Sequence, residues 1–267
     1  MPQQHIIDTL IEERAPKLVA SGFWPIIRPI MNFILGYKKA VKMADYIKDK
    51  NGEVAIDFVS KLLDLRCYFD GFENLPTNGP VIVVANHPSG IADGVALFDV
   101  LKKYRDDVKF YANSDAMRIC PSFDDVLIPV EWKYERRTRE KTRLTLLQTQ
   151  ETIKNGNVLG IFPAGRLSRI INGRLQDPEW ASSCVSIAKK YNIPILPVSI
   201  KGPNAFWFHF FGKFSQELRD ITLFHELLNK KGKQYFLHAG KLIYPSQISD
   251  DTQSAILKLK TQIEAHF

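Results

Sequence analysis

The sequence predicts an α/β fold, namely a largely parallel mixed sheet flanked by helices, with an N-terminal helical segment before it. From residue 81 onward, short apolar runs alternate with helical patterns, which is typical of βαβ units. Before residue 66, apolar residues recur mainly at helical spacing. The chain has 267 residues, 45% of them hydrophobic and 24% charged, as in folded globular proteins. We expect an N-terminal helical region at 1–65 and an α/β domain, large enough for its own core, at 66–267.

The N-terminal region carries a possible membrane segment. Residues 6–11 and 55–65 have apolar positions on one helical face. Between them, residues 23–37 are apolar with aromatic side chains at both ends, and 38–42 are rich in lysine. This pattern is typical of a helix that lies in the membrane interface. The alternative is a helical hairpin packed against the main domain.

The remaining elements follow in alternating order. Short runs rich in β-branched residues predict buried strands, and the longer periodic segments between them predict helices. The expected strands are 66–74, 81–85, 108–112, 126–130, 158–162, 195–200 and 235–239. The expected helices are 94–103, 141–155, 180–191, 217–230 and one that begins at residue 251.

Polar residues follow the strand 81–85 directly. The segment reads Asn86-His87-Pro-Ser-Gly-Ile-Ala-Asp93, at the strand end where open α/β sheets usually bind ligands. Histidine is suited to accept a proton near neutral pH, and a nearby carboxylate can orient it and stabilise its charged form. The alternative is a capped turn, with Asp93 as the helix cap and His87 as a half-buried filler.

A second polar segment follows the strand 158–162. It comprises Pro163, Ala164, Gly165, Arg166, Leu167, Ser168 and Arg169. Glycine allows close approach of a ligand, and guanidinium groups bind phosphate oxygens in pairs. A solvated turn is the alternative. If both strands are parallel members of one sheet, His87 and Arg166 emerge at the same edge.

Together these segments resemble the glycerolipid acyltransferase family. The resemblance rests on the Asn-His…Asp block at 86–93, the Phe-Pro-x-Gly-Arg block at 162–166 and Ile-Pro-Ile-Leu-Pro-Val at 193–198, and it covers about residues 66–200. It implies that His87 and Asp93 form a catalytic dyad. It also implies that the second block binds the polar head of the acceptor. The candidate substrate-binding residues are Asn86 of the first block, Pro163, Gly165 and Arg166 of the second, and Ser168 and Arg169 just after it.

Three features depart from the common family pattern. Five residues rather than four separate His87 from Asp93, as in the haemolysin-like branch that acylates lyso-ornithine lipids. Ala164 stands where the family usually has glutamate. The usual acceptor-binding arginine between the blocks has no clean match, and Arg118 or the basic run 136–139 could replace it. These departures leave the family resemblance intact but weaken the case for glycerol phosphate as the acceptor.

The resemblance implies a fatty acyl transfer from an acyl-CoA or acyl carrier protein thioester to a lysolipid hydroxyl. His87 would act as general base without a metal or other cofactor, and the loops at Gly90 and Gly165 are candidates for binding the oxyanion. The implied location is peripheral, on the cytoplasmic face of a bacterial inner membrane. The aromatic segment 204–214 could line an acyl tunnel, enter the bilayer or form a buried corner.

Composition limits the alternatives. The net charge of +7 suits an anionic partner, but no nucleic-acid-binding fingerprint is present. Three widely spaced cysteines indicate a reducing compartment. The N-terminus lacks the pattern of a secretory signal, and no apolar run is long enough for a spanning helix. A thioesterase or lipid hydrolase with the same dyad, and a non-catalytic lipid-binding protein, remain as alternative functions. The sequence has no Gly-x-Ser-x-Gly elbow, which counts against a serine hydrolase.

Overall fold

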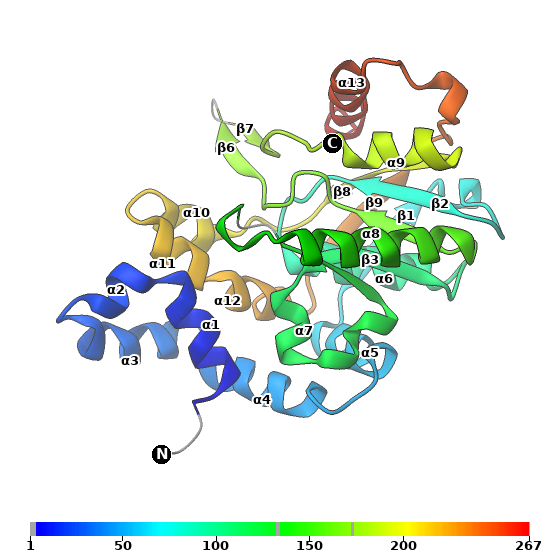
Figure 1. Cartoon of the computed structure of the whole chain (residues 1–267). Helices are drawn as coiled ribbons and strands as arrows, with labels where there is room; N and C mark the ends of the chain where they lie inside the picture. The colour runs from blue at the N-terminus through cyan, green and yellow to red at the C-terminus, as the bar shows by residue number, and fades with distance from the viewer. Residues whose placement is uncertain (1–3, 132–133, 172–173, 267) are drawn as a thin grey trace.

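A seven-stranded, mostly parallel sheet forms the centre of the computed structural model, which describes residues 4–131, 134–171 and 174–266 (Figure 1). Its strand order is β1-β9-β8-β2-β5-β3-β4, and only the β8–β9 pair is antiparallel. The strands are β1 (Arg66–Asp70), β2 (Val81–Ala85), β3 (Val108–Asn113), β4 (Leu127–Val130), β5 (Val158–Ile161), β8 (Ile195–Lys201) and β9 (Gln234–Ala239). The predicted fold class is confirmed.

Helices cover both faces of the sheet, and the alternation along β2 explains the two cores. Val81, Val83 and Ala85 pack on one side, whereas Ile82 and Val84 pack on the other, as expected for a strand buried on both faces. The first side is covered by α5 (Gly52–Leu63) and α6 (Ile91–Leu101). The second side is covered by α8 (Arg139–Lys154), α9 (Ser183–Tyr191) and α13 (Thr252–Glu264).

A second group of helices lies beside this sheet, at the lower left of Figure 1. Two distant parts of the sequence pack together there, since Met31 and Leu35 share a small core with Ile221. The group consists of α1 (Ile6–Arg14), α2 (Pro16–Ala20), α3 (Trp24–Ile34), α4 (Tyr37–Ile47), α10 (Phe206–Gly212), α11 (Gln216–Ile221) and α12 (Leu223–Leu228).

Most predicted elements are present, with shifted ends. α6 begins at Ile91 rather than 94, because the short loop before it already turns into the helix. The helix expected at 217–230 is two short helices, α11 and α12. The sequence did not predict the hairpin of β6 (Arg169–Ile171) and β7 (Arg174–Gln176), whose strands of three residues are too short to show a period. The short helix α7 (Asp115–Ile119) lies between the expected strands 108–112 and 126–130, where the sequence predicted no helix.

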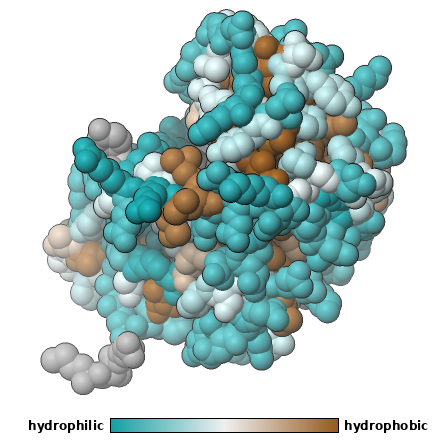
Figure 2. Space-filling model, turned by 45° about the vertical axis from the view of Figure 1, so that its right-hand side comes forward, coloured by the Kyte–Doolittle hydropathy of each residue, from teal (hydrophilic) through white to brown (hydrophobic). Residues whose placement is uncertain are grey.

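The surface is mostly hydrophilic on the face drawn in Figure 2, with separate hydrophobic patches set into it. Large exposed apolar side chains are concentrated in three helices: α3, α8 and α10 carry Ile26, Ile30, Phe33, Leu144, Leu146, Leu147, Phe206 and Phe210. In the part of the chain that the structure describes, no helix is both long and apolar enough to cross a bilayer.

Candidate active site

His87 and Asp93 lie against each other beyond the carboxyl end of β2. Nδ1 of His87 is 3.0 Å from Oδ2 of Asp93. The His87 side chain is 16% exposed, whereas the Asp93 side chain is fully buried. The distance is that of an ion pair, although the direction of approach is not that of a straight hydrogen bond. Such contacts are often poorly aligned without substrate and tighten when it binds.

The Asp93 carboxylate is held by its own loop. Its Oδ2 accepts the backbone N–H groups of Ser89, at 2.8 Å, and Gly90, at 2.9 Å. Its Oδ1 accepts the hydroxyl of Ser89, and that hydroxyl also contacts the Tyr235 hydroxyl at 2.7 Å. These N–H and O–H donors give the buried carboxylate the hydrogen-bond partners that its oxygens need.

These contacts combine the two interpretations that the sequence left open. Asp93 is in the first turn of α6 and accepts the N–H of Gly90 before the helix, as a capping carboxylate does. The same oxygen faces His87. The helix cap therefore orients the imidazole, and the ring of Phe162, 4.5 Å away between centroids, covers one side of it.

A second carboxylate holds the backbone of His87. The His87 N–H lies 3.1 Å and 3.2 Å from the two carboxylate oxygens of Asp177, and the His87 carbonyl accepts the N–H of Ser168 at 2.9 Å. Asp177 also accepts the Ser168 hydroxyl and, at 3.0 Å, the indole N–H of Trp180. Burial raises the pKa of Asp177, and these donors and the charge of His87 act against that rise.

Two residues that the sequence assigned to the acceptor have their polar atoms bonded within the protein. Asn86 accepts the N–H of Ile200 at 2.7 Å and donates to its carbonyl at 2.9 Å, so it joins the end of β2 to β8. Ser168 is buried, and it bonds to Asp177 and His87. Both residues therefore stabilise the position of His87.

The backbone N–H groups of the two candidate oxyanion glycines are also engaged. Gly90, at φ +96°, donates to Asp93, and Gly165, at φ +60°, donates to the carbonyl of Phe162 at 3.0 Å. A Cβ on Gly90 would lie 3.0 Å from Leu167. The glycines therefore allow tight turns and close packing of the two loops, and their N–H groups are not free for an oxyanion.

Three arginines gather beside the loop that follows β5. Arg166 is exposed, Arg169 begins β6, and Arg219 lies in α11. Burial and the positive charges of Arg219 and Arg166 lower the pKa of Arg169, so the three groups lie within electrostatic reach. The Nε of Arg169 is buried without a hydrogen-bond partner in the described structure. Arg219 bonds to Asp220 at 2.8 Å, which leaves an excess of positive charge for an anion.

Two of the other arginines considered from the sequence, Arg118 and Arg136, are ion-paired. Arg118 and Arg136 both bond to Glu13 of α1, at 2.7 Å and 3.1 Å from the nearest oxygens. Their contacts hold the N-terminal helices against the α/β part of the molecule. Among the residues that the structure describes, no group of three His, Cys, Asp or Glu side chains could hold a metal ion.

Sequence reasoning missed four residues of this site: Asp177, Ser89, Tyr235 and Arg219. Ser89 lies inside the recognised block and offers a hydroxyl four residues before Asp93, so it could have been found as a partner of that carboxylate. Tyr235 and Arg219 lie far from both blocks in the sequence, and Asp177 follows the second block by 11 residues. No spacing links these three residues to His87.

A comparison with protein families identifies the family of this chain. The family model described as Acyltransferase matches residues 66–201, about half of the chain. The chain belongs to this acyltransferase family. The glycerolipid acyltransferase resemblance is thereby confirmed, and the matched segment contains both polar blocks and the strands that carry them.

Two curated relatives match over most of their length. A lyso-glycine lipid O-acyltransferase of Phocaeicola vulgatus is 28% identical over 239 residues, which cover 84% of this chain and 83% of the relative. A protein of the same name from Bacteroides thetaiotaomicron is 25% identical over 261 residues, 93% of this chain and 91% of the relative.

A solved structure shares the fold of this acyltransferase. It is the crystal structure of the 1-acyl-sn-glycerophosphate (LPA) acyltransferase PlsC from Thermotoga maritima, with a TM-score of 0.51 and 18% sequence identity. The match covers 90% of this chain and 96% of the other. It supports the fold.

Proposed function

We propose that this acyltransferase moves a fatty acyl group from an acyl-CoA or acyl carrier protein thioester to the hydroxyl of a lysolipid. The observation that carries the proposal is the pair of His87 and buried Asp93 at the carboxyl edge of the sheet. The two relatives, both lyso-glycine lipid O-acyltransferases, support a lysolipid acceptor. The family match supports acyl transfer as the reaction.

His87 acts as general base in this proposal. Because Nδ1 is buried against Asp93, Nε2 is the nitrogen that takes the proton of the acceptor hydroxyl. The hydroxyl oxygen attacks the thioester carbonyl, and the tetrahedral intermediate collapses with cleavage of the C–S bond. The imidazolium, stabilised by the Asp93 carboxylate, then returns its proton to the leaving thiolate.

Arg166 and Arg169 bind the acidic head of the acceptor, and we add Arg219 to them. Guanidinium groups bind carboxylate or phosphate oxygens with two parallel hydrogen bonds. An anion bound here would accept a hydrogen bond from the Nε of Arg169 and would be attracted by the positive charges of all three groups. A glycine head joined through its nitrogen keeps a free carboxylate, which fits this chemistry.

Product analysis tests the proposed function. The purified full chain is incubated with palmitoyl-CoA or palmitoyl carrier protein and a panel of lysolipids, with a lyso-glycine lipid and lysophosphatidic acid among them. We expect an acylated lipid with at least one lysolipid and no release of fatty acid above the rate without acceptor. Free fatty acid as the main product would instead identify a hydrolase, and no product would favour lipid binding without catalysis.

The helical region 1–65 makes the membrane contact in this proposal. Phe33 of α3 is 90% exposed, Ile26 and Ile30 of the same helix are also exposed, and lysines of α4 are exposed beside them. Phe206 of α10 is exposed in the same group of helices. Apolar side chains flanked by lysines are suited to the interface of an anionic bilayer. Such contact would place the enzyme peripherally on the cytoplasmic face.

Vesicle flotation tests the membrane contact. We expect the Ile26→Ser/Phe33→Ser variant to lose most of its binding to vesicles that contain anionic lipid. Leu257→Ser is the matched control, because Leu257 is also a large exposed apolar residue but lies on α13. Equal flotation of the two variants would contradict the assignment of α3.

A further inference from the structure

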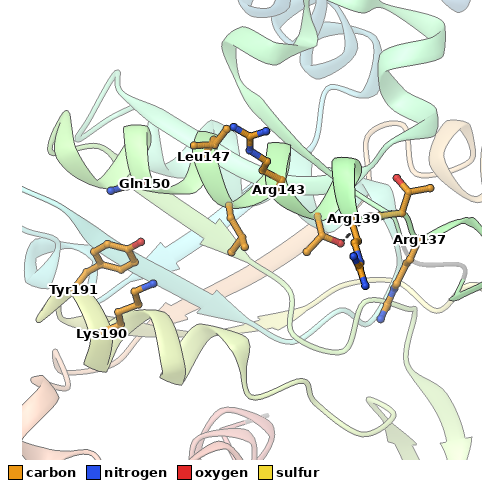
Figure 3. Close-up of a pocket in the computed structure, with 10 residues that line it drawn as sticks. Arg137, Arg139, Arg143, Leu147, Gln150, Lys190 and Tyr191 are labelled. Atoms are coloured by element: carbon orange, nitrogen blue, oxygen red, sulfur yellow. Dashed lines mark hydrogen bonds between the residues drawn. The ribbon is translucent and has the colours of Figure 1, made fainter.

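A groove of about 660 Å³ runs between α8 and α9, on the face of the sheet opposite α5 and α6. Figure 3 shows Lys190 and Tyr191 at the end of α9, and Arg139, Arg143 and Leu147 on α8. None of these residues belongs to the site around His87.

The groove is strongly basic. Arg137, Arg139, Arg143 and Lys190 line it, and no carboxylate is among the residues that line it. Within the described residues, none of these four cations forms an ion pair. Positive charge without its own counter-ions indicates an acidic ligand.

The position of the arginines on α8 runs against helix electrostatics. Arg139 is the first residue of α8, and Arg143 follows one turn later. The positive end of the helix dipole favours anions there, so cations at this end cost stability. Their presence is explained if they bind an anion from outside the chain.

Apolar side chains lie beside these charges. Leu146 and Leu147 of α8 line the groove and are 58% and 51% exposed. Basic and apolar positions at i, i+4 and i+7 along one helix face are the complement of an acidic amphipathic helix laid into a groove.

One end of the groove, at Arg137 and Arg139, lies at the catalytic edge of the sheet. β4 is parallel to β3, and α8 begins just after β4, so Arg139 lies at the carboxyl edge. His87 follows the carboxyl end of β2 in the same sheet. A carrier bound over the first half of α8 would therefore sit at the edge where its thioester must react.

We propose that the α8–α9 groove is the docking site for an acidic acyl carrier protein that delivers the acyl group to His87. This inference rests on the proposed function and names the donor that it left open. The carrier is a small acidic helical protein, and its thioester is on a flexible pantetheine arm. The groove supplies the cations and exposed leucines for one helix of the carrier, while the arm reaches around the edge of the sheet.

Charge reversal in the groove tests the inference. Arg139→Glu/Arg143→Glu should weaken binding of a holo acyl carrier protein, measured by titration calorimetry, at least about tenfold. It should lower kcat/KM with palmitoyl carrier protein by a similar factor and change it less than about twofold with palmitoyl-CoA. A glutamate at position 139 suits the helix dipole, so unfolding is not the expected cause of a loss.

The matched control is Lys61→Glu/Lys233→Glu, which makes the same change in net charge at exposed positions, one on α5 and one before β9. We expect this control to bind the carrier as the unchanged protein does. Equal carrier binding by the groove variant would overturn the inference. An equal loss of kcat/KM with both donors would also overturn it, because the groove would then bind the phosphates of CoA. A loss of vesicle flotation with carrier binding retained would overturn it as well. Because carrier binding is measured without turnover, absence of acyl transfer would count against the proposed function alone.

Discussion

The two loops that form the candidate active site are stabilised in different ways. The loop 86–93 closes on itself, because Asp93 bonds to Ser89 and Gly90 within four residues. The loop 162–169 depends on distant partners, because Ser168 bonds to Asp177, whose N–H in turn donates to Glu264 at 2.8 Å. Leu167, packed against Gly90, joins the two loops.

The two loops therefore act on different parts of His87, one on its side chain and the other on its backbone. The first loop carries the imidazole and the carboxylate that orients it, so its contacts act on the His87 side chain. The second loop and Asp177 hold the His87 backbone from the other side. Two buried carboxylates thus act on one histidine, and single substitutions are expected to separate their effects.

The largest effect is expected for His87→Ala. Removal of the general base should lower kcat at least about a hundredfold, because such catalysis is typically worth about 10²–10⁴ in rate. Steady-state kinetics with saturating acceptor measures this, and thermal unfolding should change little. His238→Ala is the matched control, since His238 pairs with Asp70 on strands β9 and β1, away from β2. Unchanged turnover of His87→Ala would remove the dyad.

Asp93→Asn should give the next largest loss. The amide keeps the size of the side chain but lacks the charge that stabilises the imidazolium, so kcat should fall at least about tenfold. Asp106→Asn, at a carboxylate that is 92% exposed, is the control and should keep full activity. If the two variants have equal turnover, the Asp93 carboxylate has no electrostatic part in the reaction.

Asp177→Asn should act mainly on stability. An amide cannot accept all the donors that the carboxylate accepts, and each buried donor left without a partner costs about 1–3 kcal/mol. Denaturant unfolding should therefore report a loss of roughly that size, with kcat lowered less than in Asp93→Asn. A larger kcat effect at Asp177 than at Asp93 would mean that the second loop, rather than the first, controls the chemistry of His87.

Arg166→Ala and Arg219→Gln should mainly raise the KM for the acceptor. Loss of a hydrogen bond to a charged group costs about 1.5–3 kcal/mol, which corresponds to about tenfold or more in affinity. Lys213→Gln, at an exposed residue just after α10, is the control. An effect on the KM of the acyl donor alone would assign the arginine cluster to the other substrate.

The smallest effect is expected at Glu13, a partly exposed carboxylate that contrasts with the two buried ones. Its hydrogen bond with Arg118 lowers the pKa of Glu13 to about 2 from 4.5. Because the folded state holds the proton less tightly, the ion pair stabilises the fold above about pH 4.5, and this is lost as the pH falls toward about 2. Solvent screening keeps the contribution below about 1 kcal/mol. Glu13→Gln should remove this pH dependence in unfolding experiments, and Glu140→Gln on α8 should not.

Local sequence patterns predicted most of the fold because the central strands are short apolar runs and the long helices have a helical period. β2 and β5 are short β-branched runs, and the first turn of α13 is capped by Asp251 as its sequence indicates. The misses fall where that signal is short or broken. β6 and β7 have three residues each, and the segment 217–230 divides because Thr222 ends one helix and begins the next.

The sequence by itself determined the individual strands and the short loop that brings Asp93 to His87, because these depend on local composition and on contacts between near neighbours. Only the tertiary structure decided which distant groups complete the site. Asp177, Tyr235 and Arg219 reach it from β7, β9 and α11 or their ends, and chain separation carries no signal for such contacts. It also decided that Asn86 and Ser168 bond within the protein, since a polar side chain pairs with whatever partner folding places beside it.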